Sequence, residues 1–309
     1  MKINTLAFLF SLVCYLTTFY YKLLYLYVFI YIDMDDTYHK IDLDLANLGI
    51  GKRMYHYKKI RSTQQLAISL AESNITNEHG TVILADEQDE GIGRGKKKWV
   101  SPIGGLWMSL IIKPRIKFAK INMISVISAI SVCEAIYDIF QLKTFIKWPN
   151  DILINDKKLA GILIDTNTNN SKNDYLIIGI GINIDVDIPK INLSVASNNI
   201  LPMRVTSIHN EIKVKNIDRF ILMKQLLGKI DFYLSLVEHD RNHKKIIGIY
   251  KKLSNTLGKR IIVYHEGLKK YSGIVKEIDN GGGLILERDD KVLDRIYSGE
   301  ISIREQNDK

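Results

Sequence analysis

The chain has 309 residues, of which 46% are apolar and 25% are charged, and its formal net charge is +9 at pH 7. This composition is typical of a globular protein, and five prolines without a long Ser/Gly tract argue against extensive disorder. The basic balance favours anionic partners, whether nucleotides, acidic proteins, nucleic acid or membrane surfaces, and does not choose among them.

Cysteine and histidine usage indicates neither a disulfide framework nor a metal site. The two cysteines, Cys14 and Cys133, favour a reducing compartment, and we expect the cytoplasm. His239 and His243 lie four residues apart near an expected helix end, but they lack an adjacent Glu and a third ligand. A solvated helix face explains the pair better, so no protein-bound metal is expected.

An apolar run occupies residues 6–32, interrupted by Lys22, and it is long enough for a membrane span. Three readings are open: a membrane anchor, a signal peptide that lacks a small-residue cleavage site, or translation that starts later, at Met34 or Met54. In each case we expect residues 1–53 to lie outside the soluble fold. Membrane association is expected only if the run is retained.

Downstream of this region, the apolar pattern predicts a mixed sheet flanked by helices, an α+β fold. Strands are expected at 54–60, 80–88, 106–114 and in four runs at hairpin spacing between 144 and 185, and helices at 62–72, 119–140, 216–237 and 239–256. From Gly258 onward, short strands separated by glycine turns predict a small β module of the barrel kind. We therefore expect one domain over 54–256 and a second over 257–309.

A basic, glycine-rich loop is expected between two strands, in the sequence DEQDEGIGRGKKKWVSPIGGLW (86–107). Three glycines alternate around Arg94, and three lysines and Trp99 follow. Glycines permit close backbone approach to a ligand, and the cations can bind phosphate, so a mobile loop of this kind would clamp a nucleotide. The loop is neither a P-loop nor a Rossmann turn. A solvated basic loop or a nucleic-acid patch remains the alternative.

Two further stretches carry polar groups at strand ends. KWPNDILINDKKLAG (147–161) predicts a tight hairpin in which Lys147 either snorkels or meets an anion. Turn chemistry alone would explain Asn150 and Asp151. In GIGINID (179–185), the alternating glycines indicate a group packed close to the backbone, although small residues under a helix would give the same pattern.

Taken together, these segments resemble the biotin–protein ligase family over most of residues 54–305. GIGRGKKKWVSPIGGLWMS is similar to the family's GRGRxGRxW loop, KWPNDILINDKKLAGIL is nearly unaltered, and GIGIN matches GxGIN. Ser62 and Thr63 at a strand-to-helix junction, Gln88, and the elements at 271–273 and 298–300 also fit. KWPND together with KLAGIL is highly specific.

The resemblance implies a class II synthetase-like catalytic domain with a small C-terminal SH3-like β-barrel. It implies that biotin and Mg-ATP give biotinyl-5′-AMP and pyrophosphate. The biotinyl group then passes to a lysine of a biotin carboxyl carrier domain of a biotin-dependent carboxylase, such as acetyl-CoA carboxylase. The cofactors and substrates implied are ATP, Mg²⁺ and biotin. No protein nucleophile is needed, in agreement with the absence of a Ser/His/Asp or Cys/His set.

The resemblance also implies roles for individual residues. Arg94 and Lys147 would stabilise charge at the α-phosphate as the catalytic pair. Biotin would be bound by Ser62, Thr63, Gln64, Gln88, Ile92, Gly93, Arg94, Lys147 and Gly161, with Lys158 beside them. ATP and the adenylate would be bound by Arg94, Trp99, Lys147, Asn150 and Asn183.

The sequence departs from the family pattern at three positions. Ile92 stands where an arginine is usual, Lys96 where glycine is usual, and Gln64 where asparagine is common. A lipoate–protein ligase, or a catalytically impaired relative that binds nucleotide or biotin, are the alternatives. No helix-turn-helix is found before Met54, so DNA binding is not expected, and a homodimer is compatible with the sequence.

Overall fold

The structure is a computed structural model, and it describes residue 45 and residues 47–73, 79–113, 121–167, 174–189, 204–214, 217–239, 242–265, 268–297 and 301–305. The apolar run at 6–32 and the Ser-Gly-Glu element at 298–300 lie outside these residues.

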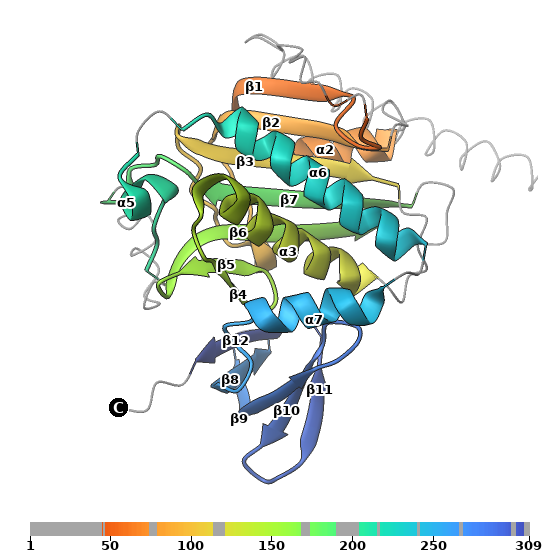
Figure 1. The fold of residues 1–309 in the computed structure, drawn as a ribbon, viewed down its shortest axis with the longest axis vertical. Helices are drawn as coiled ribbons and strands as arrows, with labels where there is room; N and C mark the ends of the chain where they lie inside the picture. The colour runs from red at the N-terminus through yellow and green to blue at the C-terminus, as the bar shows by residue number, and fades with distance from the viewer. Residues whose placement is uncertain are drawn as a thin grey trace, which may run out of the picture.

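A seven-stranded sheet forms the centre of the fold, with strand order β1-β2-β3-β7-β6-β5-β4 (Figure 1). The strands are β1 (Met54–Ile60), β2 (Thr81–Gln88), β3 (Gly105–Ile112), β4 (Phe145–Lys147), β5 (Asp151–Ile154), β6 (Lys157–Asn167) and β7 (Tyr175–Asn183). β1 and β2 are parallel, and every other neighbouring pair is antiparallel. The predicted mixed sheet is confirmed.

Helices cover both faces of this sheet. α2 (Thr63–Ser73) lies against β2, β3 and β7 on one face, and α3 (Ile121–Phe140) and α6 (Arg219–Glu238) cover the other (Figure 1). α2 begins where the sequence predicts, because the Ser62 hydroxyl accepts a hydrogen bond from the Gln65 backbone N–H at 3.4 Å. α5 (Ile208–Ile212) is a short helix that the apolar pattern did not indicate.

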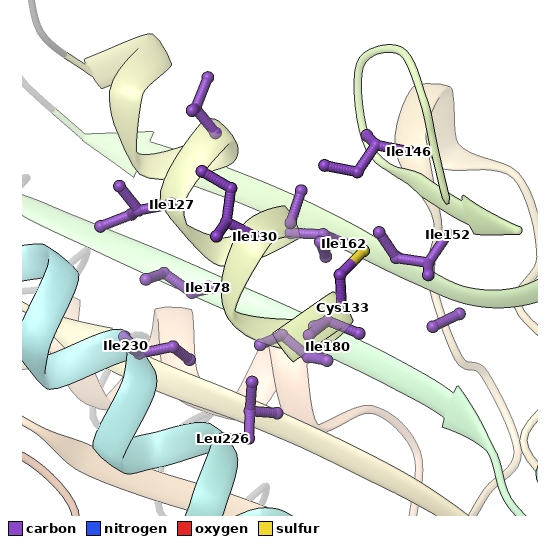
Figure 2. Packing of buried hydrophobic residues seen from close by; sticks show 14 of the residues in the cluster. Ile127, Ile130, Cys133, Ile146, Ile152, Ile162, Ile178, Ile180, Leu226 and Ile230 are labelled. Atoms are coloured by element: carbon purple, nitrogen blue, oxygen red, sulfur yellow. The ribbon is translucent and has the colours of Figure 1, made fainter. Parts of the chain in front are cut away.

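α3 is the central helix of the main core. Its residues Ile127, Ile130 and Cys133 face the sheet, and Leu226 and Ile230 of α6 close the layer (Figure 2). Within the described part of the chain, only residues 122–140 are long and apolar enough to cross a membrane, and 67% of that stretch is buried inside the fold. Burial raises the pKa of the Cys133 thiol to about 12, so it stays protonated and packs as a small apolar group.

The fold begins before the expected boundary at Met54. Leu45 and Ile50 are buried in the main core, and Ile50 has no exposed surface. The Gly51 N–H donates to the carbonyl oxygen of Gly80 at 2.7 Å, which holds this segment against the start of β2. The expectation that all of residues 1–53 lie outside the fold is therefore wrong at its C-terminal end.

The C-terminal part forms a five-stranded sheet of order β11-β10-β9-β8-β12, in which every pair is antiparallel. The strands are β8 (Arg260–His265), β9 (Leu268–Ile278), β10 (Leu284–Arg288), β11 (Leu293–Ile296) and β12 (Ile301–Glu305), reached through α7 (His243–Leu253). Its buried residues, such as Val263 and Val275, join the same core cluster as α3. The predicted β module is confirmed, and it packs on the larger unit rather than standing apart from it.

Candidate active site

Five residues form one row across the sheet, on the face that carries α2. The strand registers pair Lys147 with Asp151, Asp151 with Gly161, Gly161 with Gly181, and Gly181 with Trp107. Side chains in one such row point to the same side, because neighbouring positions along a strand alternate between faces. The Lys147 and Asp151 side chains and the backbone of the two glycines are thus aligned on one face of the sheet.

The two glycines of this row form a floor under Trp99. A Cβ atom added to Gly181 would lie 2.5 Å from the Trp99 Nε1 atom, and one added to Gly161 would lie 2.9 Å from its ring carbon Cζ3. The Trp99 ring also meets Trp107 edge to face, with 6.4 Å between the ring centroids. The group that the alternating glycines predicted close to the backbone is, at Gly181, this indole.

The glycine-rich loop is a short hairpin in this structure. The Trp99 N–H donates to the Gly91 carbonyl at 2.7 Å, and the Gly93 N–H donates to the Lys97 carbonyl at 2.7 Å. Ile92 and Lys98 form a bridge between these two bonds. Ile92 therefore occupies a paired position in the hairpin, and backbone hydrogen bonds join the two sides of the loop that the sequence predicts to be a mobile clamp.

Arg94, Asp151 and Lys158 are charged groups linked to this part of the site, and Lys158 lies over the Trp99 ring. The Arg94 Nη1 atom is buried and has no hydrogen-bond partner among the described residues. Burial lowers the pKa of the Arg94 guanidinium, and the Asp151 carboxylate partly opposes this. Asp151 is paired with Lys158 at 2.5 Å, and the Lys158 ammonium lies 4.9 Å from the Trp99 ring centroid. The guanidinium thus retains unused donor capacity, and its charge interacts with that of Asp151, the neighbour of Gly161 in the row.

A second group of polar residues lies at the start of α2. The Gln88 Oε1 atom accepts from the Thr63 backbone N–H at 2.8 Å and from its hydroxyl at 3.1 Å. The Gln88 Nε2 atom donates to Ser101 at 2.8 Å, and the Ser101 hydroxyl donates to the Trp99 carbonyl at 3.1 Å. This chain of bonds ties the first turn of α2 to the loop that carries Trp99.

Gln64 crosses the sheet above the other glycine of β7. A Cβ atom at Gly179 would lie 2.4 Å from the Gln64 Oε1 atom, so only glycine leaves room for this side chain. Gln64 is buried; it accepts from Ser109 on β3 at 2.8 Å and donates to Asp165 on β6 at 2.9 Å. The two glycines of GIGIN therefore serve two different side chains, Gln64 and Trp99.

Comparisons with known proteins agree with this geometry. Residues 57–183 match the biotin/lipoate A/B protein ligase family, and residues 256–304 match the biotin protein ligase C-terminal domain. The chain belongs to the biotin protein ligase family. The two matches cover both sheets, including the glycine floor, the Thr63–Gln88 cluster and the C-terminal module.

Individual members of the biotin protein ligase family are similar over different lengths. The bifunctional ligase/repressor BirA of Bacillus subtilis is 39% identical over 142 residues, 46% of this chain and 43% of that protein. BirA of Escherichia coli is 29% identical over 228 residues, 73% of this chain and 67% of that protein. The biotin protein ligase from Aquifex aeolicus, solved with biotin and ATP, has a TM-score of 0.67 at 28% identity, covering 83% of this chain and 100% of that one. The match thus spans less than half the length of the Bacillus relative.

Two residues that the family resemblance assigns to the nucleotide are bonded to backbone here. The Asn150 Nδ2 atom donates to the Ile162 carbonyl at 2.6 Å, and the Asn183 Nδ2 atom donates to the Thr206 carbonyl at 3.0 Å. These bonds hold the start of the hairpin and the segment after β7 in place. Lys147 is half-buried at the end of the row that runs from Lys147 to Trp107, on the same face as Asp151.

Three polar residues of the site were not singled out from the sequence. Ser109 is the one polar residue in the buried strand LWMSLII, and that isolation was a usable signal. Asp165 falls on the face of Gly161 in the alternation of β6. Ser101 lies outside the strands, and nothing in the local sequence indicated its bond to Gln88.

Proposed function

We propose that this chain is an ATP-dependent biotin–protein ligase, which forms biotinyl-5′-AMP and transfers biotin to a lysine of a carrier domain. The observation that carries the proposal is the unpartnered Nη1 atom of Arg94, whose guanidinium interacts electrostatically with Asp151 beside the glycine floor, with the Thr63–Gln88 cluster tied to the same loop. A cation for phosphate and a neutral polar cluster for an uncharged ring are what a nucleotide and biotin together require.

In the first step, a carboxylate oxygen of biotin attacks the α-phosphorus of ATP, and the bond from this phosphorus to the pyrophosphate oxygen breaks. Negative charge increases on the phosphate oxygens as the new bond forms. Arg94 and Lys147 would stabilise that charge, because fixed cations in a partly buried site need no reorganisation during the reaction. ATP would enter with its own Mg²⁺, which neutralises the departing pyrophosphate.

In the second step, the neutral amine of the carrier lysine attacks the acyl carbon of the mixed anhydride. AMP leaves with the bonding electrons, the amine loses a proton, and an amide remains. The anhydride must be kept from water until the carrier arrives. Trp99 is well placed to cover it, because its loop is anchored to Gln88 through Ser101.

The nature of the relatives supports these assignments. One is a biotin protein ligase solved with biotin and ATP, and another is the biotin–[acetyl-CoA-carboxylase] ligase of Paracoccus denitrificans. A biotin carboxyl carrier domain is therefore the proposed partner, and the net charge of +9 would favour an acidic one. We place the reaction in the cytoplasm, in a catalytic unit that ends near residue 256 and is followed by a C-terminal unit over 257–309.

Transfer to a carrier domain tests the proposal directly. The full chain is incubated with Mg-ATP, a carrier domain and either biotin or lipoate, and the carrier lysine is analysed by mass spectrometry. The expected result is a biotinyl adduct that requires ATP. A lipoyl adduct would instead assign lipoate ligation, and binding of biotin without transfer would identify a catalytically impaired relative.

A further inference from the structure

The polar cluster at the start of α2 continues across the sheet to Asp165, a residue to which no role has been assigned. The contacts run from Gln88 to Thr63, then to Ser109, Gln64 and Asp165. They join α2, β2, β3 and β6, and Gln64 passes over Gly179 of β7 to complete them. Because each partner has a limited number of donors and acceptors, the direction of every bond can be worked out from the Asp165 end.

An ionised carboxylate can only accept hydrogen bonds, so the Gln64 atom that contacts Asp165 is its amide nitrogen. This nitrogen lies 2.9 Å from the Asp165 Oδ2 atom, and its second hydrogen points to the Ile177 carbonyl at 3.5 Å. The Gln64 oxygen is thereby turned toward Ser109, at 2.8 Å. Ser109 must donate its one hydroxyl hydrogen to that oxygen.

The direction of the Ser109 hydrogen bond determines the role of the Thr63 hydroxyl. With its hydrogen used, Ser109 can only accept from the Thr63 hydroxyl, which lies 2.9 Å away. The Gln88 oxygen, 3.1 Å from the same hydroxyl, is also an acceptor, because the Gln88 nitrogen donates to Ser101. Thr63 therefore has one hydrogen and two internal acceptors. Whichever acceptor receives it, Thr63 can offer a ligand only a lone pair.

The neighbouring Ser62 hydroxyl can donate a hydrogen bond to a ligand, whereas the Thr63 hydroxyl can only accept one. Ser62 is fully buried, and its oxygen accepts from the Gln65 N–H at 3.4 Å at the start of α2. Its hydrogen finds no acceptor within the described part of the chain, so Ser62 is able to donate to a ligand. A donor at Ser62 beside an acceptor at Thr63 is complementary to a carbonyl group beside an N–H, as in a cyclic urea.

We propose that Asp165 is a positioning residue that fixes the direction of this hydrogen-bond chain, so that Thr63 accepts from an N–H of the acyl substrate. The inference rests on the proposed function and deepens it, because it makes the ring N–H a requirement of the site. A dithiolane ring, as in lipoate, has no N–H and leaves the Thr63 lone pair unpaired, which costs more than a missing apolar contact.

The variant Asp165→Asn tests the inference. An asparagine can donate as well as accept, so the Gln64 amide can turn and donate to Ser109, which then donates to Thr63. Thr63 is left with one lone pair instead of two for the substrate N–H, which weakens its role as an acceptor. The KM for biotin should rise about tenfold, which corresponds to the loss of one hydrogen bond of about 1.4 kcal/mol. The KM for ATP and the kcat at saturating biotin should stay within about twofold.

The double variant Gln64→Glu/Asp165→Asn separates direction from simple packing. The carboxylate introduced at position 64 would accept both from the amide introduced at position 165 and from Ser109. This restores the original direction at Ser109, so the KM for biotin should return toward the wild-type value. Asp290→Asn makes the same chemical change on an exposed hairpin of the C-terminal sheet and serves as the control. Each variant is compared by thermal unfolding, to confirm that it is folded.

The outcomes distinguish the inference from the function on which it rests. If the wild-type chain turns over biotin and Asp165→Asn has an unchanged KM, or the double variant is no better than the single, the positioning role is refuted alone. If the wild-type chain neither binds nor transfers biotin, the proposed function is refuted and this inference with it.

Discussion

The Trp148 indole nitrogen donates to the backbone carbonyl of Gly282 at 2.9 Å, joining the KWPND stretch to the C-terminal sheet. Trp148 is 3% exposed, and its backbone N–H donates to the Thr256 hydroxyl at 3.0 Å. Lys147, the preceding residue, points to the opposite side of the strand, where it begins the row that runs from Lys147 to Trp107. One dipeptide thus carries a site residue on one face and the attachment of the second unit on the other, which explains why a tryptophan follows the lysine.

Replacement of Trp148 by Phe should weaken this attachment while keeping most of the apolar packing. The Gly282 carbonyl would be left buried without its donor, so we expect the free energy of unfolding to fall by about 1–3 kcal/mol. Urea unfolding measures the loss, and limited proteolysis shows whether residues 257–309 become accessible first. A variant as stable and as resistant as the wild type would show that the bond does not hold the two units together.

Replacement of Lys147 by Ala should abolish adenylate formation without unfolding the protein. We expect a loss of about 100-fold or more in the rate of pyrophosphate release, as for other fixed groups that stabilise charge in a transition state. Lys143→Ala removes an exposed lysine four residues earlier and should have wild-type activity. Wild-type rates in the Lys147 variant would remove this residue from the mechanism.

Replacement of Arg94 by Gly should release the intermediate. The guanidinium has a buried, unpartnered nitrogen available for the adenylate, so its loss should increase the free biotinyl-5′-AMP per turnover about tenfold. Arg94→Lys keeps the charge without the planar fork and should give an intermediate value. Quantification of free adenylate by mass spectrometry makes the comparison, and equal retention in all three proteins would contradict the clamp.

The two glycines of β7 should respond differently to alanine. Gly181→Ala would press on the Trp99 ring, and Gly179→Ala would press on the Gln64 side chain, so each should cost about 1–3 kcal/mol of stability. Gly179→Ala should raise the KM for biotin more than Gly181→Ala does, because it disturbs the hydrogen-bond chain. Gly228, in α6, has open space around it, and Gly228→Ala should stabilise the protein by about 0.5–1 kcal/mol. Identical effects at all three positions would refute the assignment of close contacts.

The residue at which the chain starts should affect the stability of the protein. A chain that starts at Met34 keeps Leu45 and Ile50, whereas one that starts at Met54 loses both buried side chains. We expect the shorter chain to be less stable by about 2–5 kcal/mol, the usual cost of emptying a large buried apolar position. Thermal unfolding of the two chains gives the answer, and equal melting temperatures would show that the segment before Met54 is dispensable.

Local patterns were sufficient to predict most of the fold. The apolar runs of β3 and β7, the Ser-Thr junction before α2 and the apolar periodicity of α3 all depend on residues close in sequence. The boundary at Met54 was misplaced because the apolar residues Leu45, Leu48 and Ile50 lie outside any helix or strand, so no secondary-structure period marked them as part of the fold. The five residues of α5 are too few to give a helical pattern.

The site was less accessible to sequence reasoning, because its contacts join distant strands. Gln64 meets Asp165, 101 residues later, only because β7 lies between β3 and β6 in the sheet. Trp148 and Gly282 are 134 residues apart. Such pairs depend on strand order and on the docking of two sheets, which no spacing along the chain reveals.

The crossing of Gln64 above Gly179 sets a rule for altering this protein by design. The long Gln64 side chain fits only because Gly179 beneath it has no side chain. A shorter asparagine at position 64 would therefore be expected to tolerate alanine at position 179. A library intended to admit new acyl groups would therefore vary these two positions jointly, because a change at either one alone produces a collision or an empty space.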